Sequence, residues 1–185
     1  MRTGARHLRY KTMKKFKRID ELFTLNVADS RDTQDYEVGT VAFVTSSEIN
    51  NGIVRYVKPQ LGDKLFKGPC IIISGLGLAT VHTGTVLPKG NGGDSCTVLY
   101  AKDKLSLAGH IGVAAAFNVL HNWRFSFGRK CGKTRIEGLE IPWPLPPIKT
   151  AWEDQNDTAI KLLKTLENNL DRTLPAEQPA IWKGI

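Results

Sequence analysis

The sequence predicts an α+β fold with one mixed domain and a C-terminal helix. Short apolar runs rich in β-branched residues recur between positions 40 and 100, separated by Gly, Asn and Asp, as is typical of strands and turns. Residues 105–123 are apolar and rich in alanine, with the spacing of a helix. A chain of 185 residues, 41% of them hydrophobic, can bury one ordinary core and one added element. We therefore expect a basic arm at 1–15, a domain at 16–148, and a helix and tail at 149–185.

The N-terminal arm accounts for the net charge of +8. The arm and the three residues after it, 1–18, contain no acidic residue and eight basic ones: Arg2, Arg6, Arg9, Lys11, Lys14, Lys15, Lys17 and Arg18. From position 19 onward the chain has 18 basic and 18 acidic residues and is neutral. A flexible basic arm on a neutral body suits phosphate contact, because neutralising phosphates releases counterions. A leader that only improves solubility fits the same pattern.

The first elements of the domain are predicted from spacing. Residues 16–23 have apolar side chains at helical intervals, which predicts two turns of helix with one buried face. The β-branched runs 40–45 and 53–57 predict two strands. Asn50-Asn51-Gly52 between them predicts a hairpin, or a loop whose tip has positive φ.

The middle of the domain is predicted to contain three further strands and the main helix. The unbroken apolar run 70–74 predicts a buried strand that needs cover on both faces. Strands are also predicted at 79–86 and 96–100. The glycine-rich segment 89–94 between them is interpreted as a hairpin loop, or as backbone that approaches a phosphate closely. Residues 105–123 are predicted to form a central, buried helix.

The C-terminal region has the pattern of an amphipathic helix. Thr150 and Glu153 match a capping box, and prolines at 142–147 end the preceding extended segment. An apolar stripe at intervals of three and four residues follows, formed by Ile160, Leu163, Leu166, Leu170 and Leu174. The stripe packs on its own domain or pairs with a helix of a partner or a second copy.

Several classes of function are disfavoured. Three cysteines and four histidines fall at no metal-ligand spacing, so we expect reduced thiols and no bound metal. Signatures of nucleotide binding, nucleophilic catalysis, methyl transfer and nuclease activity do not occur, which argues against an enzyme. No apolar run reaches the ~20 residues that cross a bilayer, and no signal peptide is indicated. These observations predict a cytoplasmic protein without a membrane partner.

The order of motifs resembles that of target-recognition domains in the specificity subunits of type I and related restriction-modification systems. The matching segments are FKRIDELF at 16–23, GTVAFVT at 39–45, NNGI at 50–53, III at 71–73 before Gly75 and Gly77, CTVL at 96–99, FSFGRK at 125–130 and LEIPWPLP at 139–146. Together they cover roughly 16–170. A full specificity subunit has two such domains and two long helices, whereas this chain has room for one of each. Half-size forms that pair as dimers are a known arrangement in the family.

The resemblance implies a single target-recognition domain with a spacer-like C-terminal helix, which binds double-stranded DNA sequence-specifically. It implies that a partner methyltransferase or endonuclease performs the catalysis, and that the methyltransferase brings S-adenosylmethionine, so that this chain needs no cofactor. Spacer helices of the family pair, so Ile160, Leu163, Leu166 and Leu170 become candidates for pairing in a homodimer. The alternative is a non-catalytic protein-interaction module with a basic arm, such as a phage structural or inhibitor protein.

Two groups of residues have the chemistry that a DNA reader needs. Short polar side chains on one loop are candidate base readers: Thr45, Ser46, Ser47, Asn50 and Asn51. Serine and asparagine are also ordinary turn formers, which is the structural alternative. Cations without an intervening acid follow at 121–135 as candidate phosphate contacts: Arg124, Arg129, Lys130, Lys133 and Arg135. If 124–127 is extended, Phe125 and Phe127 share an inward face and the cations point outward. A solvated charged face is the competing interpretation.

Overall fold

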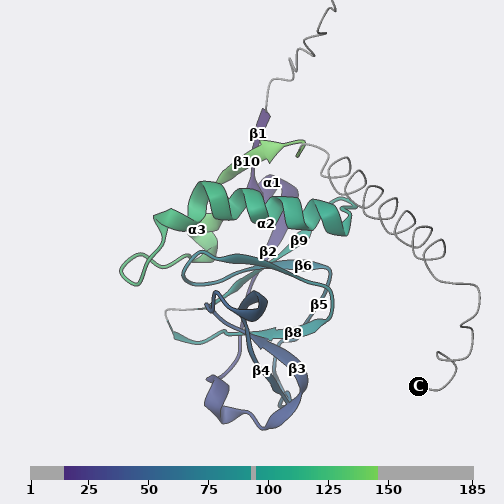
Figure 1. Cartoon of the computed structure of the whole chain (residues 1–185), viewed down its shortest axis with the longest axis vertical. Helices are drawn as coiled ribbons and strands as arrows, with labels where there is room; N and C mark the ends of the chain where they lie inside the picture. The colour runs from purple at the N-terminus through teal and green to yellow at the C-terminus, as the bar shows by residue number, and fades with distance from the viewer. Residues whose placement is uncertain (1–14, 93–94, 146–185) are drawn as a thin grey trace, which may run out of the picture. The chain divides into compact units, whose positions relative to one another are not determined.

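The computed structural model describes residues 15–92 and 95–145, which form three layers. A helix layer covers one face of a central four-stranded sheet, and an outer four-stranded sheet covers the other face (Figure 1). Contacts divide the chain into Met1–Pro146 and Pro147–Ile185, and the second unit lies outside the described residues. The expected α+β class is confirmed.

The central sheet is antiparallel throughout. In spatial order its strands are β2 (Phe23–Val27), β9 (Thr97–Ala101), β6 (Cys70–Ile73) and β7 (Ala79–His82). All four residues of β6 are buried, as the unbroken apolar run predicts. Ile71 and Ile73 pack against the helices, while Cys70 and Ile72 pack toward the outer sheet, because successive side chains of a strand point to opposite faces.

The outer sheet is mixed. In spatial order its strands are β4 (Ile53–Val57), β3 (Val38–Val44), β8 (Thr85–Pro88) and β5 (Phe66–Lys67). β3 pairs antiparallel with β4 and parallel with β8. The short 3-10 turn η2 (Asn50–Gly52) joins β3 to β4, with φ of 52° at Asn50, 54° at Asn51 and 80° at Gly52. The predicted pair of strands around a positive-φ tip is therefore confirmed.

The helix layer is formed by elements from both ends of the domain. Its members are α1 (Ile19–Leu22), α2 (Leu107–His121), the 3-10 turn η4 (Asn122–Arg124), α3 (Lys133–Glu137) and the strand pair β1 (Lys15–Arg18) with β10 (Glu140–Trp143). Ser106 caps α2 by accepting a hydrogen bond from Gly109 N at 3.1 Å. At the other end His121 Nε2 donates to the Glu140 carbonyl oxygen at 2.8 Å, which fastens α2 to β10.

Three apolar clusters hold the layers together. The largest lies between the helices and the central sheet and contains Phe23, Phe117 and Ile136. A second lies between the two sheets, where Val44 packs with Ile72. A third group, Tyr36, Phe43, Val57 and Leu87, fills the opposite face of the outer sheet, beside the connection that contains the 3-10 turn η1 (Thr33–Asp35). The first two clusters bury β6 on both faces, whereas Thr24 and Val27 of β2 stay exposed.

The prediction of a two-turn helix at 16–23 is wrong. β1 pairs with β10 in register from Lys15 with Trp143 to Arg18 with Glu140, and only one helical turn follows. Phe16 is 52% exposed, whereas the interpretation as a helix placed it on a buried face. Pairing with a strand more than 120 residues away determines the structure here, and local spacing gives no sign of such a partner.

The predicted strand 79–86 is two strands in different sheets. β7 belongs to the central sheet and β8 to the outer sheet, with Thr83 and Gly84 at the crossing. Consequently the glycine-rich segment 89–94 connects β8 to β9 across two sheets and is no hairpin loop, contrary to that interpretation. Residues 93 and 94 lie outside the described residues.

α2 is buried along one face only, where a wholly buried helix was expected. Val113, Ala114 and Phe117 face the core, but Leu107 and Val119 are 47% and 77% exposed. The prediction failed because α2 lies on the surface of the sheet and its outward face is also apolar. No helix among the described residues is both long enough and apolar enough to cross a lipid bilayer.

His82 makes the stability of the fold depend on pH. Its ring lies 2.9 Å from Thr80 Oγ1 inside the domain, and burial lowers its pKa from 6.5 to about 4. Between these two pH values the unfolded chain binds a proton that the folded chain does not. The contribution is therefore fully present above pH 6.5 and is lost as the pH falls toward 4.

We predict that acidification from pH 7 to pH 4 removes about 3 kcal/mol of folding free energy through His82. Urea unfolding of the wild type and of His82→Gln at both pH values measures this contribution. The variant should lose less stability on acidification than the wild type does. Equal losses in the two proteins would show that His82 is not the group responsible.

Candidate nucleic-acid interface

The first predicted group, the polar loop, is the β3–β4 connection. Thr45, Ser46 and Ser47 line one surface hollow together with Thr33, Val54 and Lys89. Backbone N–H groups are bonded to the loop's own hydroxyls: Ser47 N donates to Thr45 Oγ1 at 3.3 Å, and Ile49 N donates to Ser47 Oγ at 3.2 Å. The structure therefore brings these three residues together and gives two of the hydroxyls a role in shaping the loop.

Ser46 differs from its neighbours. Its hydroxyl oxygen is buried and makes no hydrogen bond within the part of the chain that the structure describes. A buried hydroxyl without a partner is unfavourable by about 1–3 kcal/mol, so such groups usually have a reason. Ser46 also lines the surface hollow described above, although its hydroxyl oxygen is turned away from solvent.

Asn51 fastens the polar loop to the free edge of the central sheet. Its side-chain Nδ2 donates to the Val81 carbonyl oxygen at 2.8 Å, and Val81 lies on β7, the last strand of that sheet. Asparagine also tolerates the left-handed φ of 54° better than most residues. Neighbouring Asn50 donates to the Ile53 carbonyl oxygen at 3.2 Å, within the loop itself.

Asn118 of α2 occupies the same strand edge. Its carboxamide accepts from Ala79 N at 2.7 Å and donates to Ala79 O at 2.9 Å, in the manner of a neighbouring strand. Unpaired N–H and C=O groups on an edge strand invite pairing with another chain. Two asparagines from distant parts of the sequence therefore close the β7 edge and position a loop and a helix on it.

The second predicted group, the basic segment 121–135, connects α2 to α3. After η4 the chain forms a tight turn in which Ser126 and Arg129 exchange backbone hydrogen bonds of 3.2 and 3.0 Å. Phe125 packs on Gly77 in the β6–β7 turn, where a Cβ would lie only 2.5 Å from the phenyl ring. Cys131 N donates to Gly75 O at 2.8 Å on the same β6–β7 turn. The β6–β7 turn thus holds the tight turn on both sides.

The cations of this segment are displayed on the surface. Arg124, Arg129, Lys133 and Arg135 are exposed and Lys130 is half-buried. Arg135 Nη1 donates to the Lys130 carbonyl oxygen at 2.6 Å, and the two side chains line the same hollow. Arg124 lines a different hollow, beside α2 and β10. The structure therefore brings Lys130 and Arg135 together, separates Arg124 from them, and places the polar loop at a third hollow.

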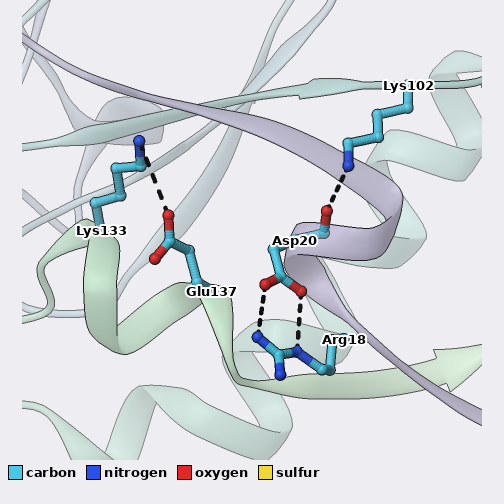
Figure 2. A network of polar contacts seen from close by, with 5 residues as sticks. All are labelled: Arg18, Asp20, Lys102, Lys133 and Glu137. Carbon is cyan, nitrogen blue, oxygen red and sulfur yellow. Dashed lines mark hydrogen bonds and ion pairs between the residues drawn. The ribbon is translucent and has the colours of Figure 1, made fainter.

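Ion pairs engage part of the positive charge on β1 and α3. Lys133 Nζ lies 3.8 Å from Glu137 Oε1, one helical turn further along α3. Figure 2 shows that pair with a second network, in which Arg18 holds the Asp20 carboxylate by two hydrogen bonds of 3.0 and 2.6 Å and Lys102 donates to the Asp20 carbonyl oxygen. Hydrogen bonding to Arg18 lowers the pKa of Asp20. All these groups lie at the surface, so they tune local charge more than stability.

The expected inward face of Phe125 and Phe127 is only half right. Phe125 is half-buried against the core, but Phe127 is 79% exposed. The tight turn interrupts the extended chain after Ser126, so period-two alternation does not continue. Lys130 Nζ lies 4.3 Å from the centroid of the Phe127 ring, and Arg124 Cζ lies 5.2 Å from that of Trp123, which is 73% exposed. The sequence did not lead us to expect exposed rings paired with cations. The turn signal Phe127-Gly128 could have indicated that the extended chain ends there.

The described residues offer no metal or thiol chemistry. No group of three His, Cys, Asp or Glu residues among them is arranged to hold a metal ion. Burial raises the pKa of the Cys70 thiol to about 11 and that of Cys131 to about 12, so both are protonated at neutral pH. What the two candidate groups present is hydroxyls, carboxamides, cations and the exposed rings of Trp123 and Phe127.

A comparison with protein families decides the assignment. The profile described as "Type I restriction modification DNA specificity domain" matches residues 11–177. The chain belongs to this family. The resemblance inferred from the sequence is therefore confirmed, and the specificity subunits of the family are in general non-catalytic.

Solved structures agree on the fold. The HsdS subunit of Thermoanaerobacter tengcongensis is 16% identical with a TM-score of 0.54, and the alignment covers 82% of this chain and 39% of that one. The S subunit of the type I restriction-modification system of M. genitalium is 12% identical with a TM-score of 0.55, covering 85% and 44%. A structure titled for complex assembly and conformational transition of the type I R-M system is 16% identical with a TM-score of 0.57, covering 85% and 42%.

This specificity domain spans about two fifths of the length of those solved chains. No curated protein matches its sequence. The arm at 1–14 and the pairing candidates Ile160, Leu163, Leu166 and Leu170 lie outside the described residues.

The asparagine anchors lead to a stability prediction. Asn118→Ala removes two hydrogen bonds and leaves edge groups of β7 unpaired, so we expect about 2 kcal/mol less folding free energy. Asn51→Ala removes one bond and adds left-handed strain, and should be less stable than Asn51→Gly, which removes the bond alone. Urea unfolding measures all three. Variants as stable as the wild type would exclude the anchoring role.

Proposed function

We propose that this domain binds a short sequence in double-stranded DNA and is the specificity component of a type I restriction-modification system. The observation that carries the proposal is the shared support of the two candidate groups. The basic segment is fixed to the β6–β7 turn through Phe125 and Cys131, and the polar loop to strand β7 through Asn51. One rigid hairpin thereby positions phosphate contacts and base readers relative to each other, as accurate recognition requires.

The basic segment supplies the phosphate contacts in this proposal. Arg129 closes the tight turn, and Lys130 and Arg135 share one hollow with Gly128 and Gly132. Guanidinium and ammonium groups at the surface suit a polyanion, and each phosphate contact adds affinity that falls as salt rises. The arm at 1–15 extends this contact as a second, sequence-independent element.

The polar loop supplies base readout. The hydroxyl of Ser46 turns into the hollow and gains its missing partner from a base edge or a bridging water, while Thr45 and Ser47 line the same hollow. Asn50 is exposed on the same loop. Hydroxyl and carboxamide groups are the side chains that discriminate base edges in a groove. Asn51 keeps the loop in register through Val81, in addition to its role as a candidate reader.

Catalysis is assigned to a partner. A methyltransferase subunit that brings S-adenosylmethionine, or an associated endonuclease, acts on the DNA in the cytoplasm, while this chain selects the site. The stripe formed by Ile160, Leu163, Leu166 and Leu170 joins two copies of the chain, or this chain and its partner, so that two half-sites are read at a fixed spacing.

Selection from a random duplex library tests the proposal. The full chain should enrich one sequence motif, and its binding should weaken as salt rises. Retention that depends on salt but not on DNA sequence would show that the chain binds polyanions non-specifically, through its basic arm. Absence of retention would favour a protein-interaction module.

Charge reversal of Arg129 and Lys130 together tests the basic segment. Arg129→Glu with Lys130→Glu should weaken binding at least tenfold and lower the slope of log K against log salt by about two, roughly one for each phosphate that is no longer neutralised. Lys58→Glu with Lys67→Glu is the matched control, since both lysines are exposed and the change of net charge is equal. Equal losses in the two variants would assign the effect to net charge and remove the segment from the interface.

The apolar stripe leads to a prediction about assembly. Light scattering of the full chain should give the mass of a dimer, and Leu163→Lys with Leu166→Lys should give a monomer, because a buried ammonium without a partner opposes helix pairing. Lys161→Ala with Lys164→Ala changes the polar side of the same segment and should leave the mass unchanged. A wild type that is monomeric at every concentration would contradict pairing between copies.

A further inference from the structure

The tip of the tight turn presents an apolar ring that the fold does not require. Phe127 and Gly128 lie between Ser126 and Arg129, whose backbones close the turn, and the Phe127 side chain is 79% exposed. Its neighbour Phe125 already fills the available place against Gly77. Phe127 therefore contributes little burial to this domain, and its ring is presented outward.

The support of this tip is rigid. Phe125 is held on the β6–β7 turn before it, and Cys131 N bonds to Gly75 O at 2.8 Å after it. The two backbone hydrogen bonds between Ser126 and Arg129 close the turn on itself. Little conformational freedom remains to be lost when the ring meets a ligand, which favours tight contact.

The surroundings of the ring identify its partner. Lys130 Nζ lies 4.3 Å from the ring centroid, and Arg129 follows the ring in the turn. Lysine is depleted in the cores of protein–protein interfaces, so a ring that is paired with Lys130 is a poor complement to an apolar protein partner. Nucleic acid offers the complement that the tip requires, because its bases have flat apolar faces and its phosphates carry negative charge on either side.

We propose that Phe127 enters a base-pair step of the bound duplex as a wedge and stacks on a base, while Arg129 and Lys130 contact the flanking phosphates. This inference rests on the proposed function and adds a deformation of the DNA to it. Apolar side chains that enter a step partly unstack it, and the cost depends on the sequence of the step. Phe127 is then a specificity-determining residue that forms no hydrogen bond to any base.

The test uses the full chain and the duplex enriched in the selection experiment, with 2-aminopurine placed at each position in turn. Unstacking brightens this base, so the wild type should brighten it at one step. Phe127→Ala should abolish the brightening and weaken specific binding roughly tenfold, as expected when one base is no longer stacked on the ring. Phe127→Trp should retain the affinity for the selected duplex, because indole also stacks.

Leu61→Ala is the matched control, since Leu61 is a fully exposed apolar residue of the β4–β5 connection. It should bind and brighten as the wild type does. Specific binding without brightening at any position, or brightening that persists in Phe127→Ala, would overturn the wedge and leave the proposed function standing. A chain that enriches no duplex would overturn both.

Discussion

Closure of the β7 edge by two asparagines is the constraint on which the rest of the domain surface depends. β7 ends the central sheet, and without Asn51 and Asn118 its outward N–H and C=O groups would need water or another strand. Because Asn118 comes from α2 and Asn51 from the polar loop, the same bonds that satisfy the strand also determine where a helix and a loop lie. The unpaired edge of the sheet thereby positions a helix and a loop that are distant in sequence.

The domain separates stability from recognition. The apolar clusters on the two faces of the central sheet contain almost none of the candidate DNA-contacting side chains, which lie on connections outside those clusters. Side chains at the hollow of the polar loop or at the tip of the tight turn can therefore vary with little effect on the core. Ser46 is the exception, since its hydroxyl is buried without a protein partner among the described residues. A family of domains that recognise different sequences on one scaffold needs this separation.

The sequence predicted those parts of the fold that depend on local pattern. The buried strand at 70–74, the turn at Asn50-Asn51-Gly52 and the class of the domain follow from apolar runs and turn residues, and the structure has all of them. The local pattern could not predict β1, because Lys15–Arg18 becomes a strand only by pairing with Glu140–Trp143. For the same reason the break of 79–86 into two strands was missed, since it reflects a second sheet that local spacing does not reveal.

The candidate site was predictable by residue type and much less by geometry. The acid-free run of cations is evident in the sequence, and Arg124, Arg129, Lys133 and Arg135 do lie at the surface. The orientation of Phe127 depends on hydrogen bonds between Ser126 and Arg129, and the anchoring of Asn51 depends on a carbonyl group 30 residues away. Neither partner can be inferred from spacing alone.

The chain's three thiols have a practical consequence. Cys70, Cys96 and Cys131 are all free and all buried, and burial raises the pKa of Cys70 and Cys131, so the thiolate that reacts with maleimides is scarce in the folded protein. A cysteine introduced at an exposed position would react far faster than these native thiols. The natural sequence therefore serves as a background for attaching a single fluorophore or spin label, without prior removal of any residue from its core.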